Sequence, residues 1–517
     1  EGSIHIHDLD FYSLTTTCIS EDSRIIIRHK GDVKVIRAKE LDTILSAHPD
    51  DTVVWLDGYE VYSDGKFVKL KNIVRHSSKG KKMLRISSLT STLEVTDDHL
   101  VTIKDKGVQV DIEAGKLCEG MTLVKAGLDS NKYTLNSIDL IELWGDREDI
   151  VIANTSEILD NLRKDKSKWK EFCSVFSYKT SKGRMTRVGH RRMTLADYLQ
   201  VEHLVNIPRE QLELAHKCSK STTRIRARVP LTASLGRFIG YVLGDGCVSE
   251  SLDTDGRTLN KRVSYCKQDP TIKEDFERVI MDVFESPSYS DRVVDGVVSG
   301  VNLGGYIVYE LFKGPFGFKN GAGDIKLPEW VYSANATFLS GFLGALVDSD
   351  GYVQGDGYRV GYTSASKEYV EGLSILLALR GIPTHIYCNN LKGTVAKFGD
   401  KESVRNHDSY QLNITGGLNE IFKDIPSYKL DTLELSDSNV LPDKKYQITS
   451  IEEMEYSGYV YDMETEDSHF SVNGVLVHNC TQIDLEKLFE EGFDTGHGYI
   501  RTPTSIESYS ALACIVI

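Results

Sequence analysis

The pattern of apolar and polar positions changes along the chain. From residue 24 to residue 125, short segments such as VKVIRA, KFVKL, MLRISS and LVTIKD are β-branched or alternate apolar with polar residues. The pairs Asp57-Gly58 and Asp64-Gly65 mark turns between such segments. No helical periodicity runs through this part, so the pattern predicts a region of short strands.

Residues 231–430 follow a different pattern, in which helix-like and strand-like segments alternate. LGRFIGYVLGDGCV at 235–248 resembles LSGFLGALVDSDGYV at 339–353, and each copy is followed by an amphipathic helical pattern, at 269–284 and 366–382. Two copies at a spacing of roughly one hundred residues do not make a solenoid, which needs more copies at a shorter period. The repeat therefore predicts an α/β domain with an internal pseudo-twofold duplication.

Strand-like segments return at 445–479, which contain YQITSIEEME, GYVYDMET and HFSVNGVLVH. A single β-rich unit interrupted by a separate domain explains this order, because surface turns tolerate insertions of that kind. The two β-rich parts are thus predicted to form one domain.

Charge distinguishes one more region, 131–230. Its part 161–230 holds 17 Lys and Arg against 6 Asp and Glu, although the whole chain has a net charge of −15. A solvated helical surface is the ordinary explanation of a charge run. The sign imbalance here, with Trp169, Tyr178 and Tyr198 interleaved, favours contact with a polyanion such as double-stranded DNA.

Composition narrows the class of protein. Of the 517 residues, 40% are hydrophobic and 26% charged, which is typical of globular domains. No apolar run approaches the ~20 residues needed to cross a bilayer, and the first residues show no signal peptide. The nine cysteines form no CxxC pair, which argues against a disulfide framework or a zinc site. We expect a cytoplasmic protein without membrane contact.

Three short elements acquire a meaning when they are read together. Cys18 follows three threonines and opens the first β-rich region, TDDH ends at His99, and the tripeptide His478-Asn479-Cys480 closes the second β-rich region. Each element alone has an ordinary explanation, such as a small buried cysteine. In this order and with these flanks, they resemble the intein family, whose splicing domain is an all-β, horseshoe-like Hint fold.

The resemblance implies the first step of protein splicing. The Cys18 thiol attacks the carbonyl of Thr17 and turns a peptide bond into a thioester, a reaction that suits an intrinsically nucleophilic sulfur. The departing amine needs a proton, and the tetrahedral oxyanion needs support. In the family the histidine of the TxxH motif supplies the proton and its threonine supports the scissile bond, which implies these roles for His99 and Thr96.

The resemblance also implies the later steps. Cys480 takes over the acyl group, and the side-chain amide of Asn479 attacks its own carbonyl to form a succinimide, a ring closure favoured because it is intramolecular. His478 assists as an acid or base. The family pattern further places an aspartate and a histidine upstream, here Asp462 and His469. Asp462 would tune Cys18 or protonate a leaving group, whereas a turn or edge-strand carboxylate is the alternative.

FIGYVLGDG and LGALVDSDG resemble two copies of the LAGLIDADG signature of homing endonucleases. Small residues would let the two helices pack backbone to backbone, and each helix would end at an acidic residue followed by glycine. The first copy departs from the signature at Leu243. The small residues expected at the helix contact are Gly240, Gly244, Gly344 and Ala345.

In that family each repeat supplies one acidic residue, here Asp245 and Asp350. Two adjacent carboxylates repel unless divalent cations lie between them, and Mg²⁺ bound there would stabilise the oxygens that enter and leave at a phosphodiester. The family's KxP segment suggests Lys326 as a phosphate contact, with a surface lysine as the alternative. For the second repeat Lys423 and Lys429 both stay open. The resemblance implies an endonuclease that acts as a monomer.

When residues 18–479 are left out, the two flanking segments read as one continuous protein sequence. HIHDLD before the first junction and GFDTGHG after the second resemble the anaerobic ribonucleoside-triphosphate reductase family, in which the cysteine at position 480 belongs to the redox-active site. The family's glycyl-radical segment is not among these residues, so we expect no reductase activity. An endonuclease with inert splicing motifs and a reductase fragment with a merely structural insert are the alternatives.

These observations predict a mixed fold in which an α/β endonuclease domain interrupts an all-β splicing domain. The expected segments are 1–17 and 480–517 as reductase flanks, 18–130 and 436–479 as the two parts of the splicing domain, 131–230 as a basic DNA-recognition region, and 231–435 as the LAGLIDADG domain.

Overall fold

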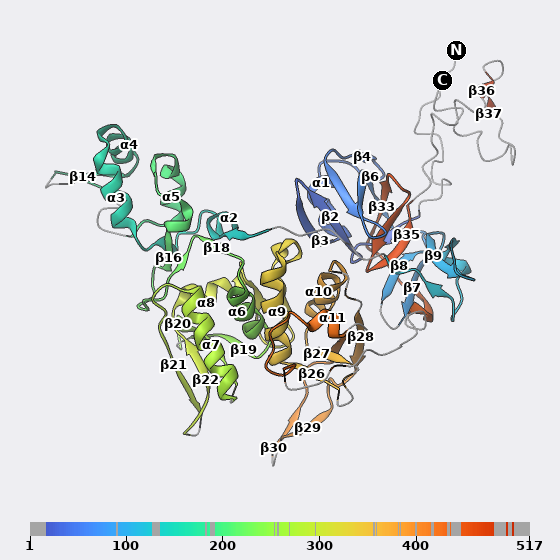
Figure 1. The fold of residues 1–517 in the computed structure, drawn as a ribbon. Coiled ribbons are helices and arrows are strands. Elements are labelled where there is room, and N and C mark those ends of the chain that lie inside the picture. Colours follow the sequence, from blue (N-terminus) through green and yellow to red (C-terminus); the bar gives the residue numbers. More distant parts are fainter. Residues whose placement is uncertain are drawn as a thin grey trace. The chain divides into compact units, whose positions relative to one another are not determined.

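The computed structural model describes residues 17–479 with short gaps, together with 493–494 and 499–500. The chain forms two compact units, of which unit 1 comprises 1–128 and 442–517 and unit 2 comprises 129–441 (Figure 1). Among the described residues, no helix is both long and apolar enough to cross a membrane. The gaps lie at 89–90, 127–134, 181–182, 187–191, 253, 256–257, 268, 295, 355–356, 358, 381, 383, 399–400, 415–417, 432–434 and 436–445. The predicted nucleophile Cys480 lies outside the described residues.

Unit 1 is built from antiparallel strands, as the alternating pattern predicts. Its larger sheet has the order β3-β2-β5-β6-β33-β1-β8-β7-β32, with β4 beside β6, and its smaller sheet has the order β10-β9-β35-β34, with β11 beside β9. The strands of the N-terminal part are β1 (Ile19–Ser20), β2 (Arg24–His29), β3 (Asp32–Arg37), β4 (Val54–Trp55), β5 (Tyr59–Tyr62), β6 (Phe67–Ser77), β7 (Met83–Ser88), β8 (Thr92–Thr96), β9 (Leu100–Asp105), β10 (Val108–Glu113) and β11 (Thr122–Leu123), and α1 covers Asp42–Leu45.

The C-terminal strands of unit 1 are woven between those of the N-terminal part. β33 pairs with both β6 and β1, and Ile19 lies opposite Tyr461. Val477 similarly lies opposite Val101 of β9. One apolar core runs through both parts, because Ile19, Tyr461, Val101 and Val477 all belong to it. These C-terminal strands are β32 (Ile448–Met454), β33 (Tyr459–Thr465), β34 (His469–Val472) and β35 (Val475–His478), and a further pair is β36 (Phe493–Asp494) with β37 (Tyr499–Ile500).

Unit 2 is centred on two packed helices, α6 (Ala233–Leu243) and α9 (Ala336–Asp348). Each is followed by a four-stranded antiparallel sheet, of order β19-β20-β22-β21 after α6 and β26-β27-β31-β28 after α9. The other elements of this part are β19 (Gly246–Leu252), β20 (Thr258–Tyr265), α7 (Pro270–Val283), β21 (Tyr289–Val294), β22 (Val297–Leu303), α8 (Tyr306–Leu311), β23 (Lys313–Gly314), β24 (Gly317–Lys319), β25 (Ile325–Lys326), β26 (Gly351–Val353), β27 (Val360–Ser364), α10 (Lys367–Ala378), β28 (Thr384–Asn389), β29 (Val395–Phe398), β30 (Lys401–Val404), β31 (Ser409–Ile414) and α11 (Leu418–Phe422).

Glycine sets the distance between α6 and α9. A Cβ on Gly236 would lie 2.1 Å from the carbonyl oxygen of Phe338, and one on Gly240 would lie 2.7 Å from that of Phe342. Not every small residue faces the partner helix, however. A Cβ on Gly344 would instead lie 2.0 Å from the carbonyl oxygen of Pro426, so this glycine admits the 426–430 segment. Both helices also end before the acidic residues of their motifs, at Leu243 and Asp348.

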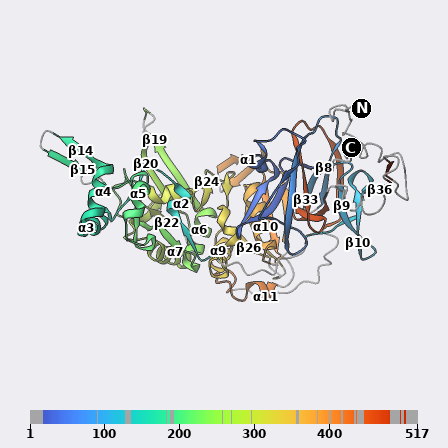
Figure 2. The same cartoon turned by 90° about the horizontal axis from the view of Figure 1, so that it is seen from above.

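The basic region folds into small helices and short strands within unit 2. In both views α3, α4 and β14 lie at one end of this unit and α10 at the other (Figures 1 and 2). The elements are β12 (Ser137–Asp139), α2 (Leu140–Trp144), β13 (Ile150–Ile152), α3 (Thr155–Lys164), α4 (Lys166–Phe176), β14 (Ser177–Thr180), β15 (Gly183–Thr186), α5 (Leu195–Val201), β16 (Glu213–His216), β17 (Ile225–Arg226) and β18 (Arg228–Pro230).

Several arginines of this region are engaged within the protein. Arg209 lies 2.8 Å from Asp139, and further pairs join Arg224 to Glu213 and Arg226 to Glu285. The positive excess in the sequence therefore overstates the charge that these arginines offer to a polyanion.

Candidate functional sites

Cys18 is fully buried at the start of β1, beside the end of β8. Its backbone N–H donates to Oγ1 of Thr96 at 3.0 Å, and the Thr96 N–H donates to the carbonyl oxygen of Cys18, also at 3.0 Å. Lys81 places Nζ 3.4 Å from the Cys18 sulfur. The structure thus brings Cys18 and Thr96 together, and it adds a cation at the thiol that the sequence did not indicate.

His99 lies next to this pair and is buried from solvent. Its backbone N–H donates to Thr96 O at 3.0 Å, which fixes the turn of the TxxH motif. Burial lowers the pKa of His99 to about 4, the nearby Thr17 backbone opposes that shift, and the charge of His478 adds to it. Neither ring nitrogen of His99 has a hydrogen-bond partner among the described residues. The ring is therefore neutral at neutral pH and adjoins the Thr17 backbone.

The C-terminal residues are held in a tight arrangement. Asn479 is buried, and its backbone N–H donates to Ser468 O at 2.8 Å. His478 places Nδ1 2.7 Å from the carbonyl oxygen of Asn479, so a protonated Nδ1 donates to that oxygen. His478 also contributes to the low pKa of His99, which puts the two predicted histidines within electrostatic reach of each other.

His469 joins this group through a residue that the sequence gave no reason to select. Its Nε2 lies 3.3 Å from Oδ2 of Asp111, and its ring meets the edge of the His478 ring with centroids 4.9 Å apart. The ligating atoms of Asp111, His469 and His478 lie within 4.8 Å of one another, close enough to hold a metal ion. Asp111 is 358 residues away from His469 in sequence, so only the folded sheet reveals the contact.

Asp462 lies in the middle of β33, buried to 7% exposure and opposite Val74 of β6. Its Oδ1 accepts from the N–H of Met463 at 2.7 Å. Because Ile19 lies opposite Tyr461 in the antiparallel pair, continuing the register by one residue sets Asp462 opposite Cys18. This placement favours the tuning role over the alternative of an edge-strand carboxylate.

In unit 2, the ends of α6 and α9 bring Asp245 and Asp350 together. Desolvation by the surrounding protein, followed by the charge of Asp245, raises the pKa of Asp350 to about 7. Asp350 is nevertheless an exposed residue, so the charge of the neighbouring carboxylate is the firmer cause of this direction. Lys267 donates to Asp245 Oδ2 at 2.6 Å and to the carbonyl oxygen of Ser349 at 3.0 Å. Two carboxylates that resist joint ionisation, next to open space, form a suitable donor set for a hard divalent cation.

Lys267 and a second lysine, Lys319, lie around this pair. Lys319 is buried, and its Nζ donates to the carbonyl oxygens of Val242 and Leu243 at 2.9 and 2.8 Å. Burial lowers the pKa of Lys319 to about 8, whereas Asp350 and Asp245 oppose that shift. The sequence analysis did not select this lysine or Lys267.

Lys326 lies on β25, the strand that pairs with the one carrying Lys319. The two lysine side chains point to opposite faces of this hairpin. Neighbouring side chains alternate between the faces of a strand, so burial of Ile325 leaves Lys326 exposed, where its Nζ lies 3.3 Å from Glu368. In the second repeat, Lys429 donates to the carbonyl oxygens of Ser349 and Gly351, both at 2.8 Å. The other candidate, Lys423, is paired with Glu420 instead.

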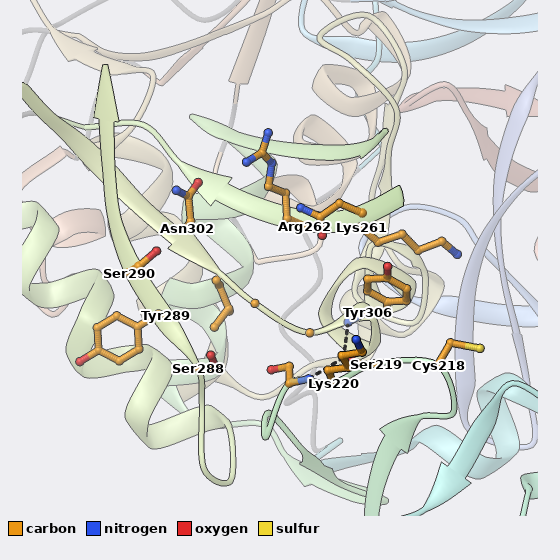
Figure 3. Close-up of a pocket in the computed structure, with 15 residues that line it drawn as sticks. Cys218, Ser219, Lys220, Lys261, Arg262, Ser288, Tyr289, Ser290, Asn302 and Tyr306 are labelled. Atoms are coloured by element: carbon orange, nitrogen blue, oxygen red, sulfur yellow. Dashed lines mark hydrogen bonds between the residues drawn. The ribbon is translucent and has the colours of Figure 1, made fainter. Parts of the chain in front are cut away.

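Besides a smaller cavity next to α11, two larger cavities open on the described part of unit 2. One, of about 540 Å³, is lined by Asp245, Asp350 and Lys319 together with Arg405 and His407. The other, of about 560 Å³, lies against strands β20, β21 and β22 (Figure 3). Its labelled side chains are polar or basic, and they are Cys218, Ser219, Lys220, Lys261, Arg262, Ser288, Tyr289, Ser290, Asn302 and Tyr306.

Two parts of the chain match known protein families. Residues 337–419 match the family described as LAGLIDADG-like domain, and residues 455–517 match the family described as anaerobic ribonucleoside-triphosphate reductase. Over 257 residues the chain is 30% identical to the probable translation initiation factor IF-2 of Methanocaldococcus jannaschii, which covers 48% of this chain and 20% of that protein. The chain spans a third or less of the length of the first curated relatives that it matches.

Two solved structures are similar to separate parts of the chain. The transcription factor IIB Mvu mini-intein is 23% identical, with a TM-score of 0.19, and the match covers 21% of this chain and 70% of that one. Mesophilic variants of the homing endonuclease I-DmoI are 17% identical, with a TM-score of 0.28, over 38% of this chain and 96% of that one.

Proposed function

Because the chain combines a LAGLIDADG-like domain with a segment of the anaerobic ribonucleoside-triphosphate reductase family, we propose that it is a self-splicing reductase precursor. In this proposal, residues 18–479 are an intein that excises itself and joins Thr17 to Cys480. Unit 1 holds the Hint-type, horseshoe-like splicing domain, and unit 2 holds a homing endonuclease. The observation that carries the proposal is that Cys18, Thr96 and His99 share one unit with His478 and Asn479.

The first step follows from the contacts of Cys18. Its sulfur attacks the Thr17 carbonyl carbon, a C–S bond forms, and the C–N bond to Cys18 breaks. The thiol proton ends on the released amine. Thr96 Oγ1 already accepts from this N–H at 3.0 Å, and the neutral His99 ring next to the Thr17 backbone can carry the proton between sulfur and nitrogen.

The release step follows from the contacts of Asn479. Transfer of the acyl group from Cys18 to the Cys480 sulfur precedes it. The Asn479 side-chain nitrogen then attacks the Asn479 carbonyl carbon, and the bond to Cys480 breaks. Negative charge develops on the same carbonyl oxygen that lies 2.7 Å from His478 Nδ1, so a proton there stabilises the transition state. The freed amine of Cys480 finally displaces its own sulfur and leaves an ordinary peptide bond.

For unit 2 we propose a monomeric endonuclease that cuts double-stranded DNA, with α6 and α9 related by the pseudo-twofold repeat. Asp245 and Asp350 would hold Mg²⁺, which when bound supplies charge stabilisation for the entering and leaving oxygens of the phosphodiester. Lys267 and Lys319 replace Lys326 as the proposed cations of this centre. Lys319 ties down the end of α6, and Lys267 bridges Asp245 to the end of α9.

The basic cavity on β20–β22 supports a DNA contact outside the cutting centre. Arg262 is exposed there, whereas Lys261 is held by Glu310 at 2.6 Å (Figure 3). The exposed Arg262 suits phosphate contacts, which give affinity without sequence choice. The proposed target is the uninterrupted reductase gene at the junction that encodes Thr17 and Cys480.

Expression of the precursor tests the proposal. Intact-mass measurement should find the excised segment 18–479 and a ligated peptide that reads SLTTTCTQIDL across the junction. An unspliced chain that still cuts DNA would favour the alternative of an endonuclease with inert splicing motifs. A junction at any other residue would contradict the assigned boundaries.

A further inference from the structure

Asp111 is a charged residue next to the release step that has no part in the proposed chemistry. It lies on β10, and its Oδ1 accepts a hydrogen bond of 2.7 Å from Thr102 Oγ1 on the neighbouring strand β9. Its Oδ2 lies 3.3 Å from Nε2 of His469. Both β9 and β10 belong to the sheet that carries β34 and β35. The carboxylate is therefore held in place from one side and meets an imidazole on the other.

His469 is placed between two oxygen acceptors. Its Nδ1 lies 3.1 Å from the carbonyl oxygen of Asp467, and its Nε2 meets the carboxylate of Asp111. Each ring nitrogen faces one of these oxygens, so the two contacts together fix the plane of the ring. A fixed His469 ring in turn presents its face or edge to whatever lies beside it.

The residue beside it is His478. The planes of the two rings meet at 75°, with centroids 4.9 Å apart. Nδ1 of His478 lies 2.7 Å from the Asn479 carbonyl oxygen. His478 has a single useful orientation, because turning its ring removes Nδ1 from that oxygen. Asp111, His469 and His478 thus form a continuous series of contacts that ends on the scissile carbonyl.

We propose that Asp111 is a positioning residue for C-terminal cleavage. It fixes His469, and through His469 it holds the His478 N–H on the oxygen that becomes negative when Asn479 cyclises. This inference rests on the proposed splicing function and adds a residue to it.

In the described part of the chain, three titratable side chains lie around His469. Asp111 approaches from β10 and His478 from β35, while Asp467, in the turn before β34, lies 3.3 Å from Lys66. His99 adjoins His478 electrostatically. Removing the charge of Asp111 therefore leaves His469 facing one partnered carboxylate and a second imidazole.

C-terminal cleavage can be measured alone in a Cys18→Ala precursor, by the rate at which residues 480–517 are released. Asp111→Asn keeps the size and one acceptor oxygen but loses the charge. We expect release to slow by on the order of tenfold to a hundredfold, because small displacements of a catalytic group have effects of that size. Asp111→Glu should restore part of the rate. All samples contain EDTA, so that a metal ion at the three side chains cannot contribute.

A matched control separates positioning from folding. In an Asn479→Ala precursor, thiol-induced cleavage before Cys18 should be unchanged by Asp111→Asn, and so should the thermal unfolding temperature. Equal losses in both reactions would contradict the inference, as would an unaltered rate of release. If the Cys18→Ala parent with Asp111 intact releases nothing, the proposed splicing function itself fails.

Discussion

Arg237 donates a hydrogen bond of 2.7 Å from Nη2 to Oδ2 of Asp348, and both side chains are almost completely buried. The contact ties α6 to α9. The same guanidinium reaches Asp275 at 2.5 Å, and Asp348 also accepts from Ser427 Oγ at 2.7 Å. The first repeat has Leu243 at the motif position equivalent to Asp348. The end of α6 therefore has no carboxylate there that could form the same contact. The contact of Arg237 with Asp348 holds α9 just before the turn that presents Asp350.

The buried pair makes a stability prediction. Asp348→Ala leaves Arg237 buried between fewer acceptors and should lower the free energy of unfolding by about 3–5 kcal/mol. Urea denaturation of a precursor blocked by Cys18→Ala and Asn479→Ala measures this. Substituting the exposed Glu420 by Ala is the control, and its effect should be within about 0.5 kcal/mol. A small effect of Asp348→Ala would show that the pair is not needed to hold the two helices.

Asn479→Ala separates the two ends of the splicing reaction. It removes the nitrogen that closes the succinimide, so the C-terminal flank should stay attached. Cleavage before Cys18 should still occur when a thiol is added, because the contacts between Cys18 and Thr96 do not involve Asn479. Gel electrophoresis and mass spectrometry report both events. Joined flanks from this variant would refute the cyclisation step.

Asp350→Asn tests the proposed cutting centre. It should abolish or greatly weaken cleavage of a plasmid that carries the uninterrupted junction in the presence of Mg²⁺, while DNA binding persists through phosphate contacts. Splicing should continue at its normal rate, because its residues lie in unit 1. Complete double-strand cutting by this variant would overturn the assignment.

The lysines offer a matched comparison. Lys319→Met removes a buried cation that supports the end of α6 and should reduce cutting by at least tenfold, on the scale of a lost charge-assisted contact. Lys326→Met removes an exposed cation paired with Glu368 and should leave cutting almost unchanged. Plasmid cleavage rates at equal protein concentration decide between them, and the reverse order would restore the original choice of Lys326.

The titration of Asp350 gives a pH prediction. Its pKa is raised to about 7 in the folded protein, so the carboxyl is neutral below that pH and takes up a proton that an unfolded chain releases near 4. Cutting should therefore rise as the pH passes upward through about 7, and more Mg²⁺ should shift the rise to lower pH. The sign for stability is opposite, since this group's contribution is present at low pH and is lost as the pH rises to 7. Cleavage rates across this range at two Mg²⁺ concentrations provide the measurement.

Local signals in the sequence were sufficient for residues whose role depends on their neighbours in the chain. Alternation indicated the strands around Cys18 and Asn479, and a repeated motif selected Asp245 and Asp350, which the fold brings side by side. The family pattern also selected His469, but its carboxylate partner Asp111 carries no signal of its own.

Other features depend on register and on long-range packing. Lys319 and Lys326 belong to one hairpin, and only strand alternation decides which of them turns inward. Gly344 resembled a helix-contact glycine, yet it faces Pro426, because the 426–430 segment packs over α9. The side to which such residues turn depends on contacts with residues far apart in sequence. A local sequence pattern therefore does not predict it.

The position of β33 determines when Cys18, the proposed nucleophile, can react. This strand sits between β6 and β1, and it is synthesised only after the whole of unit 2 has been synthesised. Until residue 459 and those that follow are available, the sheet around Cys18 lacks its neighbour, and the bond before Cys18 has no assembled site to break it. If the proposed splicing takes place, the interruption of the β-rich unit delays cleavage before Cys18 until most of the chain has been synthesised.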